Sequence, residues 1–362
     1  MLPPPGAAIL IIVLGAVALA CLLALRDRGE GYEDATTAAA TTAAATTPNH
    51  ADAKPKTIFV SVPSYRDASC MRTLRNMFAM ATHPGRVFVG CCEQNTASVK
   101  EQCKPNKFKY HANVRVISIP HGEAKGPTYA RALCADLYRG EDFVLSIDSH
   151  SKFAKGWDVA LIDMLRACPS PKAIVTHYPP ERKAAKDPNV DAHGIPCLCA
   201  SKFGGDGLPV LEAVMVAATA GAPRPVPYLA GGMWFAPGSV FADVPMDPTL
   251  SHLFQGEEFL LSARCWTAGY DMYTPTKSVV FHYYGRKGEP HYWDDQPKTW
   301  HALQTATGAR VRQILGLEQP GMPDYAYGMG SARTLQAYYD YCGIDPVAKT
   351  SRSKDIFCAE IK

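Results

Sequence analysis

Apolar and polar positions follow a strand and helix rhythm along most of this chain, beginning at residue 57. Short apolar runs predict buried strands, and apolar residues three and four positions apart predict helices. The expected strands are 57–62, 87–92, 114–119, 143–147, 173–178, 233–236 and 278–284, and the expected helices are 71–81, 128–138, 157–167 and 256–268. This order favours right-handed crossovers, a largely parallel sheet and helices on both of its faces.

Two stretches depart from this rhythm. Residues 179–224 are rich in Pro, Gly, Lys and Ala and predict an insertion or a loop over a site, because long loops are usually functional lids or disordered. Residues 311–362, with their tyrosines and glycines, predict a C-terminal extension around the first lobe rather than a second domain. The sequence therefore predicts one α/β domain over residues 57–310, with this extension packed on it.

The first 56 residues have a different pattern. A short tail, residues 1–6, precedes nineteen uncharged residues, 7–25, which are enough for one membrane helix. A cleaved signal peptide is the alternative, but its apolar region would normally be shorter and follow a basic residue. Residues 26–56 are rich in Thr and Ala and predict a flexible stalk. The chain is thus expected to be a single-pass membrane protein with an N-terminal anchor.

The charge of the chain argues against nucleic-acid partners, but the cysteine content does not identify the cellular compartment. The formal net charge of +3 is spread without basic runs, so nucleic-acid binding is not expected. Of the 12 cysteines, Cys21 lies in the expected membrane helix, and the odd number that remains forbids complete pairing within one chain. Arg26 and Arg28 follow the helix and favour a cytosolic domain, whereas a stalked domain behind a short anchor is typical of the Golgi lumen. The side of the membrane stays open.

Candidate chemistry lies where the apolar run 143–147 ends, at Asp148 and His150. Ligands bind beyond the carboxyl ends of the strands in an open α/β sheet, so this carboxylate and imidazole can jointly hold a divalent cation. Taken alone, such a pair is more often a capping aspartate and a surface histidine. His282, inside the apolar run 278–284, would likewise more often be a core histidine.

Five segments in fixed order change this balance. They are IFVSVPSYRD at 58–67, SIDSH at 146–150, LAGGMWFAPGS at 229–239, GEE at 256–258 and FHYY at 281–284. Together they resemble the eukaryotic and viral GlcNAc-transferase family, which includes enzymes that attach GlcNAc to hydroxyproline. The chain is similar in turn to the polypeptide N-acetylgalactosaminyltransferases, where D-S-H, A-G-G and G-E-N occur in the same order. The resemblance covers residues 57–300, and the ordered set makes it specific, since each motif alone would be weak.

The resemblance implies a GT-A fold, in which a Rossmann-like nucleotide-binding half is fused to an acceptor half. Asp148, His150 and His282 would bind Mn²⁺, which would neutralise the leaving diphosphate. The implied reaction is a retaining transfer of a sugar from a UDP-sugar to a hydroxyl of a protein or glycan. UDP-GlcNAc is the favoured donor and UDP-GalNAc comes next.

The resemblance also implies residues that bind the donor near its nucleotide. Those in the turn after the first strand would meet uridine or its phosphates: Pro63, Ser64, Tyr65 and Arg66. Lys125 and Arg131 would place cations near the diphosphate, although Lys125 replaces an arginine of the related pattern. An exposed turn arginine and a solvated helix arginine are the plain alternatives for Arg66 and Arg131.

A second group of expected donor residues would meet the sugar. Gly231 and Gly232 let the backbone approach it closely, and Trp234 beside them would stack on it. Glu257 aligns with the glutamate of G-E-N and would accept hydrogen bonds from sugar hydroxyls, while Glu258 stands in place of the asparagine. Two acidic residues at a helix start are also favourable partners of the helix dipole.

The expected catalytic residues are Glu257, Asp148 and Arg131. Two other interpretations stay open for the same residues. A metal-dependent sugar-nucleotide or phosphoester hydrolase would use the same ion, but it needs a second metal cluster or an activated water that the sequence does not indicate. A non-catalytic membrane protein that binds a sugar nucleotide or a glycan would keep the site without turnover.

Overall fold

The computed structural model describes residues 56–103, 108–218, 221–286, 288–296, 299–322 and 324–358. The expected tail, the membrane helix at 7–25 and the stalk up to residue 55 lie outside these ranges. Within the described ranges, no helix has both the length and the apolar character needed to cross a membrane.

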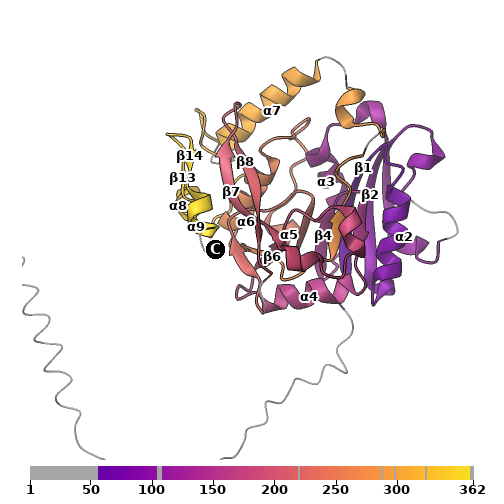
Figure 1. Ribbon diagram of the computed structural model, residues 1–362. Helices are drawn as coiled ribbons and strands as arrows, with labels where there is room; N and C mark the ends of the chain where they lie inside the picture. The colour runs from indigo at the N-terminus through magenta and orange to yellow at the C-terminus, as the bar shows by residue number, and fades with distance from the viewer. Residues whose placement is uncertain are drawn as a thin grey trace, which may run out of the picture. The chain divides into compact units, whose positions relative to one another are not determined.

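A central sheet organises the domain, and β1, β2 and β4 of this sheet are labelled in Figure 1. It has eight strands in the order β3-β2-β1-β4-β10-β6-β11-β9. Its strands are β1 (Ile58–Tyr65), β2 (Val87–Asn95), β3 (Val114–Pro120), β4 (Phe143–Ile147), β6 (Ala173–Thr176), β9 (Arg224–Val226), β10 (Met233–Pro237) and β11 (Asp271–Thr274). The first four strands pair in parallel, as do β6 and β11, whereas β10 and β9 run antiparallel to their neighbours. The prediction of a mostly parallel sheet is confirmed.

Helices cover both faces of this sheet. They are α2 (Cys70–Met80), α3 (Pro127–Ala135), α4 (Trp157–Ala167), α5 (Val240–Asp243), α6 (Glu257–Thr267), α7 (Trp300–Ile314), α8 (Leu335–Cys342) and α9 (Ser353–Phe357). Side chains alternate along β1, so Val60 joins a core with Leu74 of α2 and Leu161 of α4. Its neighbour Phe59 joins a second core with Phe259 of α6. The alternation of buried side chains therefore produces a three-layer α/β domain.

The segment expected to be an insertion or loop contains a long hairpin. Strands β7 (Ile195–Phe203) and β8 (Pro209–Val216) pair antiparallel, and residues 197–200 are buried in the same core as α6. The turn between the strands includes Gly205-Asp206-Gly207, which is a usual hairpin signal. A register shift between Cys197 and Ala200 breaks the alternation that would have marked the strand. The Pro- and Gly-rich composition thus concealed ordered structure.

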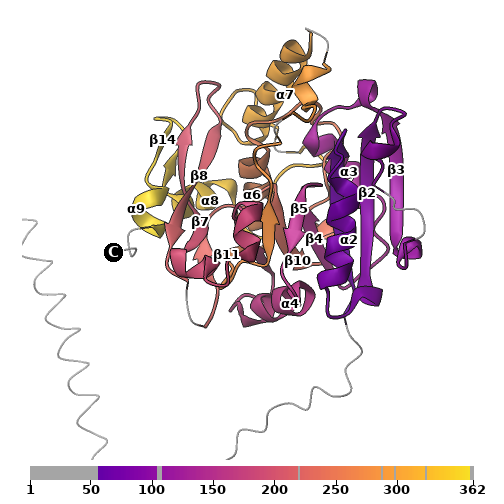
Figure 2. The ribbon, with the colours of Figure 1, turned by 45° about the vertical axis from the view of Figure 1, so that its right-hand side comes forward.

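The C-terminal extension packs on the second half of the domain, not around the first lobe as expected. It continues from α8 through β13 (Ile344–Asp345) and β14 (Thr350–Ser351) to α9, and both views place it beside β7 and β8 (Figures 1 and 2). Tyr338 and Tyr339 of α8 are buried against Phe259, and Cys358 forms a disulfide with Cys199. The apolar face of α8 packs against α6, and the sequence pattern does not specify this contact.

Candidate active site

A cleft of about 560 Å³ opens at the carboxyl ends of β1 and β4 and at the N-termini of α3 and α6. Most of the expected site residues line it: Pro63, Ser64, Tyr65, Arg131, Asp148, His150, Gly231, Gly232, Glu257, Glu258 and His282. Residues 63–65 belong to β1, which continues beyond its expected end at residue 62. The fold therefore brings together all five of the quoted segments.

Asp148, His150 and His282 form a compact cluster at the base of this cleft. Asp148 and His150 follow β4, and the short strand β12 (Val280–His282) pairs with β5 (Ser151–Phe153) so that His282 lies opposite Ser151. One potential ligand atom from each of the three residues lies within 4.8 Å of the others. Nε2 of His282 is 3.0 Å from Oδ2 of Asp148. Burial opposes ionisation, yet the His282 hydrogen bond and the Arg131 charge hold the pKa of Asp148 well below its usual range.

Arg131 joins the two expected catalytic carboxylates. Its Nη1 donates to Oε1 of Glu257 at 2.5 Å, and its Nη2 donates to Oδ1 of Asp148 at 3.1 Å. Thr128, one turn earlier on α3, donates its hydroxyl to Oε2 of Glu257 at 2.5 Å. Burial lowers the pKa of Arg131, but the adjacent carboxylates outweigh that effect and raise it, so the guanidinium stays charged.

Glu258 lies beside this group in a different environment. Its Oε1 accepts the backbone N–H of Gly231 at 2.7 Å, and its Oε2 accepts the hydroxyl of Tyr178 at 2.5 Å. Burial raises the pKa of Glu258 to about 7, and the hydrogen bond from Tyr178 opposes the shift. The helix start therefore carries one carboxylate paired with an arginine and one that titrates near neutral pH.

The two expected glycines leave room for carboxylates. A Cβ on Gly231 would lie 3.0 Å from Oε1 of Glu257, and a Cβ on Gly232 would lie 3.1 Å from Oδ2 of Asp148. Such contacts are tighter than ordinary packing allows, so an alanine would displace the acidic side chains. Close approach was expected here, but the protein's own carboxylates already occupy the space beside both glycines.

Three expected donor residues do not line the cleft. Nη1 of Arg66 lies 2.7 and 2.9 Å from the two carboxylate oxygens of Asp295. Lys125 is exposed, with its Nζ 5.0 Å from the centroid of the Tyr129 ring. Trp234 is only 2% exposed, and it belongs to the core on the face of β10 that faces away from Met233. The expectation that its ring meets a sugar is wrong for this arrangement, because both faces of β10 are covered.

Other residues of the site were missed by the sequence analysis. Asp67 is fully buried and contacts Nδ1 of His150 at 2.8 Å, and Tyr178 and Thr128 hold the two glutamates. Burial opposes the ionisation of Asp67, yet the hydrogen bond with His150 lowers the pKa of this carboxyl group to about 2. Asp67 ends the quoted segment 58–67, so its position after the first strand was the available signal.

Two solved structures show which known folds this chain resembles. GalNAc-T7 with UDP, GalNAc and Mn²⁺ aligns at 16% identity and a TM-score of 0.51, over 86% of this chain and 57% of that chain. TarS 1–349 of S. aureus in complex with UDP-GlcNAc aligns at 12% identity and a TM-score of 0.43, over 71% of this chain and 66% of that chain. The chain thus spans little more than half of GalNAc-T7, and at this identity the likeness shows the fold alone.

The family follows from the sequence. The model of the family described as glycosyltransferase (GlcNAc) matches residues 57–109 and 97–348, and the chain belongs to this family. No curated protein matches the sequence at a significant level. The expected membership in a GlcNAc-transferase family is confirmed, and the protein is a glycosyltransferase.

Proposed function

We propose that this glycosyltransferase moves GlcNAc from UDP-GlcNAc to a hydroxyl of a protein or glycan acceptor, with Mn²⁺ held by Asp148, His150 and His282. The observation that carries the proposal is the cluster of one carboxylate and two imidazoles at the carboxyl end of β4. The family description supports GlcNAc as the sugar, and the ligands of GalNAc-T7 support a UDP-linked donor and Mn²⁺.

The donor set suits Mn²⁺ better than Ca²⁺, because it combines a carboxylate oxygen with imidazole nitrogens. Nδ1 of His150 is engaged by Asp67, which leaves its Nε2 for a ligand. Nε2 of His282 already faces Asp148, while its Nδ1 is buried without a hydrogen-bond partner among the described residues. When bound, the ion would neutralise charge on the leaving diphosphate.

The chain's own residues would orient the sugar and fix the local charge. Arg131 pairs with Glu257 and Asp148 and holds both carboxylates in place, so that Glu257 lies in position to accept hydrogen bonds from sugar hydroxyls. In the retaining transfer that we propose, the acceptor hydroxyl attacks from the face that the diphosphate leaves. A leaving phosphate oxygen would take its proton, so no enzyme nucleophile is required.

We further propose that residues 7–25 anchor the enzyme and that its catalytic domain lies in the lumen of the secretory pathway. Two disulfides among the described residues, Cys70–Cys103 and Cys199–Cys358, support the lumenal side, because disulfides persist in oxidising compartments. The two arginines after the expected helix favour the opposite side but are a weak signal.

The test is UDP release from a panel of UDP-sugars, with and without Mn²⁺, by a soluble protein that begins at Lys54, where the compact unit begins. We expect metal-dependent release from UDP-GlcNAc in the presence of an acceptor, and a loss of at least about 100-fold in Asp148→Asn. Asp163→Asn, an exposed acid on α4, is the matched control and should keep full activity. Release that is independent of any acceptor would favour the hydrolase, and nucleotide binding without release would favour the binding protein.

A further inference from the structure

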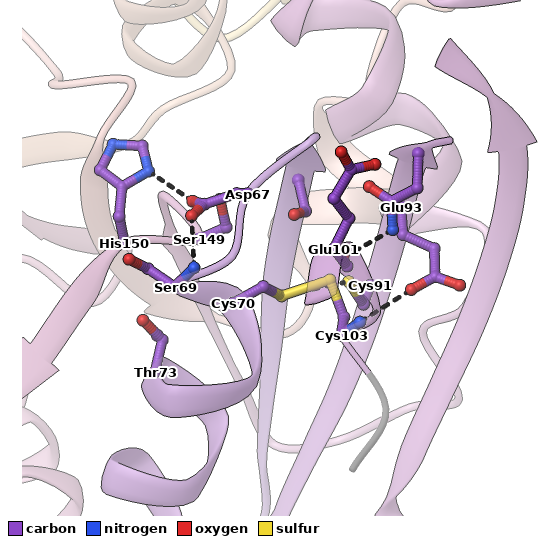
Figure 3. The surroundings of a disulfide bond; sticks show 12 residues. Asp67, Ser69, Cys70, Thr73, Cys91, Glu93, Glu101, Cys103, Ser149 and His150 are labelled. Atoms are coloured by element: carbon purple, nitrogen blue, oxygen red, sulfur yellow. Dashed lines mark hydrogen bonds and ion pairs between the residues drawn. A yellow bond between two sulfur atoms is a disulfide. The ribbon is translucent and has the colours of Figure 1, made fainter. Parts of the chain in front are cut away.

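A fully buried carboxylate supports the cluster from behind. Asp67 is 0% exposed, and its Oδ2 lies 2.8 Å from Nδ1 of His150 (Figure 3). The same oxygen accepts the hydroxyl of Ser149 at 2.5 Å, and Oδ1 accepts the backbone N–H of Ser69 at 2.7 Å. Burying a charge is costly unless it is fully hydrogen-bonded, and here both oxygens are engaged.

We propose that Asp67 is a positioning residue of the metal site, which fixes the tautomer and the ring orientation of His150. The inference rests on the proposed function. A carboxylate oxygen of Asp67 lies 2.8 Å from Nδ1 of His150, and carboxylate oxygens accept hydrogen bonds, so this contact places a proton of the imidazole on Nδ1. Nε2 then carries the lone pair, and a metal-ligating histidine needs that arrangement.

The backbone around Asp67 is itself held on both sides. Arg66, the preceding residue, pairs with Asp295 and Glu101. Cys70, the first residue of α2, forms a disulfide with Cys103, and its N–H donates to the carbonyl of Asp67 at 3.2 Å (Figure 3). The carboxylate therefore has a fixed place from which to orient the ring.

Asp67 supports only one of the two imidazoles among the described residues. His150 lies in the link between β4 and β5, where its carbonyl accepts the N–H of Tyr283 at 3.2 Å, and His282 is part of β12 and is paired with Ser151. Nδ1 of His282 has no hydrogen-bond partner among the described residues. The two imidazoles thus reach the same site by different means, and only His150 depends on a buried acid.

The test is Mn²⁺ binding by the full chain in detergent without nucleotide, measured from the electron paramagnetic resonance signal of free Mn²⁺. We expect Asp67→Asn to weaken binding by about 10- to 100-fold, as loss of such supporting groups usually does. Ser149→Ala is the matched control, because it removes a neighbouring hydrogen bond to the same oxygen and leaves the contact with His150. It should bind Mn²⁺ within about threefold of the wild-type protein, which is below the range expected for a supporting group.

A second readout separates positioning from a purely structural role. In Asp67→Asn, saturating Mn²⁺ should restore most of kcat, whereas Asp148→Asn should stay inactive at every Mn²⁺ concentration. Equal Mn²⁺ affinity in Asp67→Asn and the wild-type protein would overturn the assignment. Equal weakening in Asp67→Asn and Ser149→Ala, with a matching fall in Tm, would also overturn it by showing a structural effect.

The wild-type protein alone gives an independent answer if Asp67→Asn does not fold. Nitrogen NMR of the imidazoles should show His150 with its proton on Nδ1, and a proton on Nε2 would refute the proposal. A wild-type protein that binds no Mn²⁺ but shows the Nδ1 tautomer would instead overturn the metal site of the proposed function, and with it the role of Asp67 toward a metal.

Discussion

Arg131 is the residue whose removal should disturb the site most, because two carboxylates depend on it. The residue is only 6% exposed, and its side chain bridges Glu257 and Asp148 at 2.5 and 3.1 Å. Arg131→Met keeps much of the apolar length of the side chain but removes the cation. Both carboxylates would then face the cleft without that counter-charge, in a protein free of metal.

The expected loss of unfolding free energy in Arg131→Met depends on the hydrogen bonds that each carboxylate retains. Removing one partner of a buried ion pair typically costs 3–5 kcal/mol, at order-of-magnitude level. Glu257 keeps the hydroxyl of Thr128, and Asp148 keeps His282, so we expect the lower end, about 3 kcal/mol. For a domain of this size, that corresponds to a fall in Tm of about 6 °C.

The assay is thermal and urea unfolding of the metal-free protein at neutral pH. Lys172→Met is the control, because it breaks an exposed pair with Asp243 that is worth at most about 1 kcal/mol. Adding Glu257→Gln to Arg131→Met should recover part of the loss, since it removes one stranded charge. If Arg131→Met is as stable as Lys172→Met, the bridge does not carry the electrostatic role assigned to it.

Two further predictions concern pH and compartment. Burial raises the pKa of Glu258 from 4.5 to about 7, so the native state holds an extra proton between these values. The stability that this group contributes is full below pH 4.5 and is lost as pH rises through about 7. Between pH 5 and pH 8, the wild-type protein should therefore lose up to about 3 kcal/mol of unfolding free energy relative to Glu258→Gln. Denaturant unfolding at several pH values measures this difference, and a constant difference would contradict it. For the compartment, protease added to intact microsomes should leave the catalytic domain uncut, and cleavage before detergent is added would place the domain in the cytosol.

The site was predictable where a single strand or motif fixes a residue. The apolar run of β4 is short and uninterrupted, so its end at Ile147 and the placement of Asp148 followed directly. His282 came from the resemblance rather than from its strand, because β12 is only three residues long and pairs outside the central sheet. Its partnership with Asp148 depends on a β5–β12 pairing that no local pattern indicates.

The two wrong placements, of Trp234 and Arg66, have different physical causes. Trp234 lies on a strand with helices on each face, so alternation along the strand does not tell which face meets a ligand. Arg66 has a φ of 45°, and this turn directs it to Asp295 instead of the cleft. Asp295 is 229 positions from Arg66 in the sequence, and periodicity does not report such a partner.

The balance of charge in the cleft gives a separate argument for a metal-dependent transferase. Among the described residues that line it, Arg131 is committed to Glu257 and Asp148, and Nε of Arg286 lies 3.3 Å from Glu289. Lys125, the other cation expected near the diphosphate, and Arg66, expected to meet uridine or its phosphates, do not line the cleft. A diphosphate entering this cleft would therefore find its arginines already paired with acids and would need charge from another source. A divalent ion held by the Asp148 cluster, as we propose, would supply that charge at the carboxyl end of β4, where ligands of open α/β sheets bind.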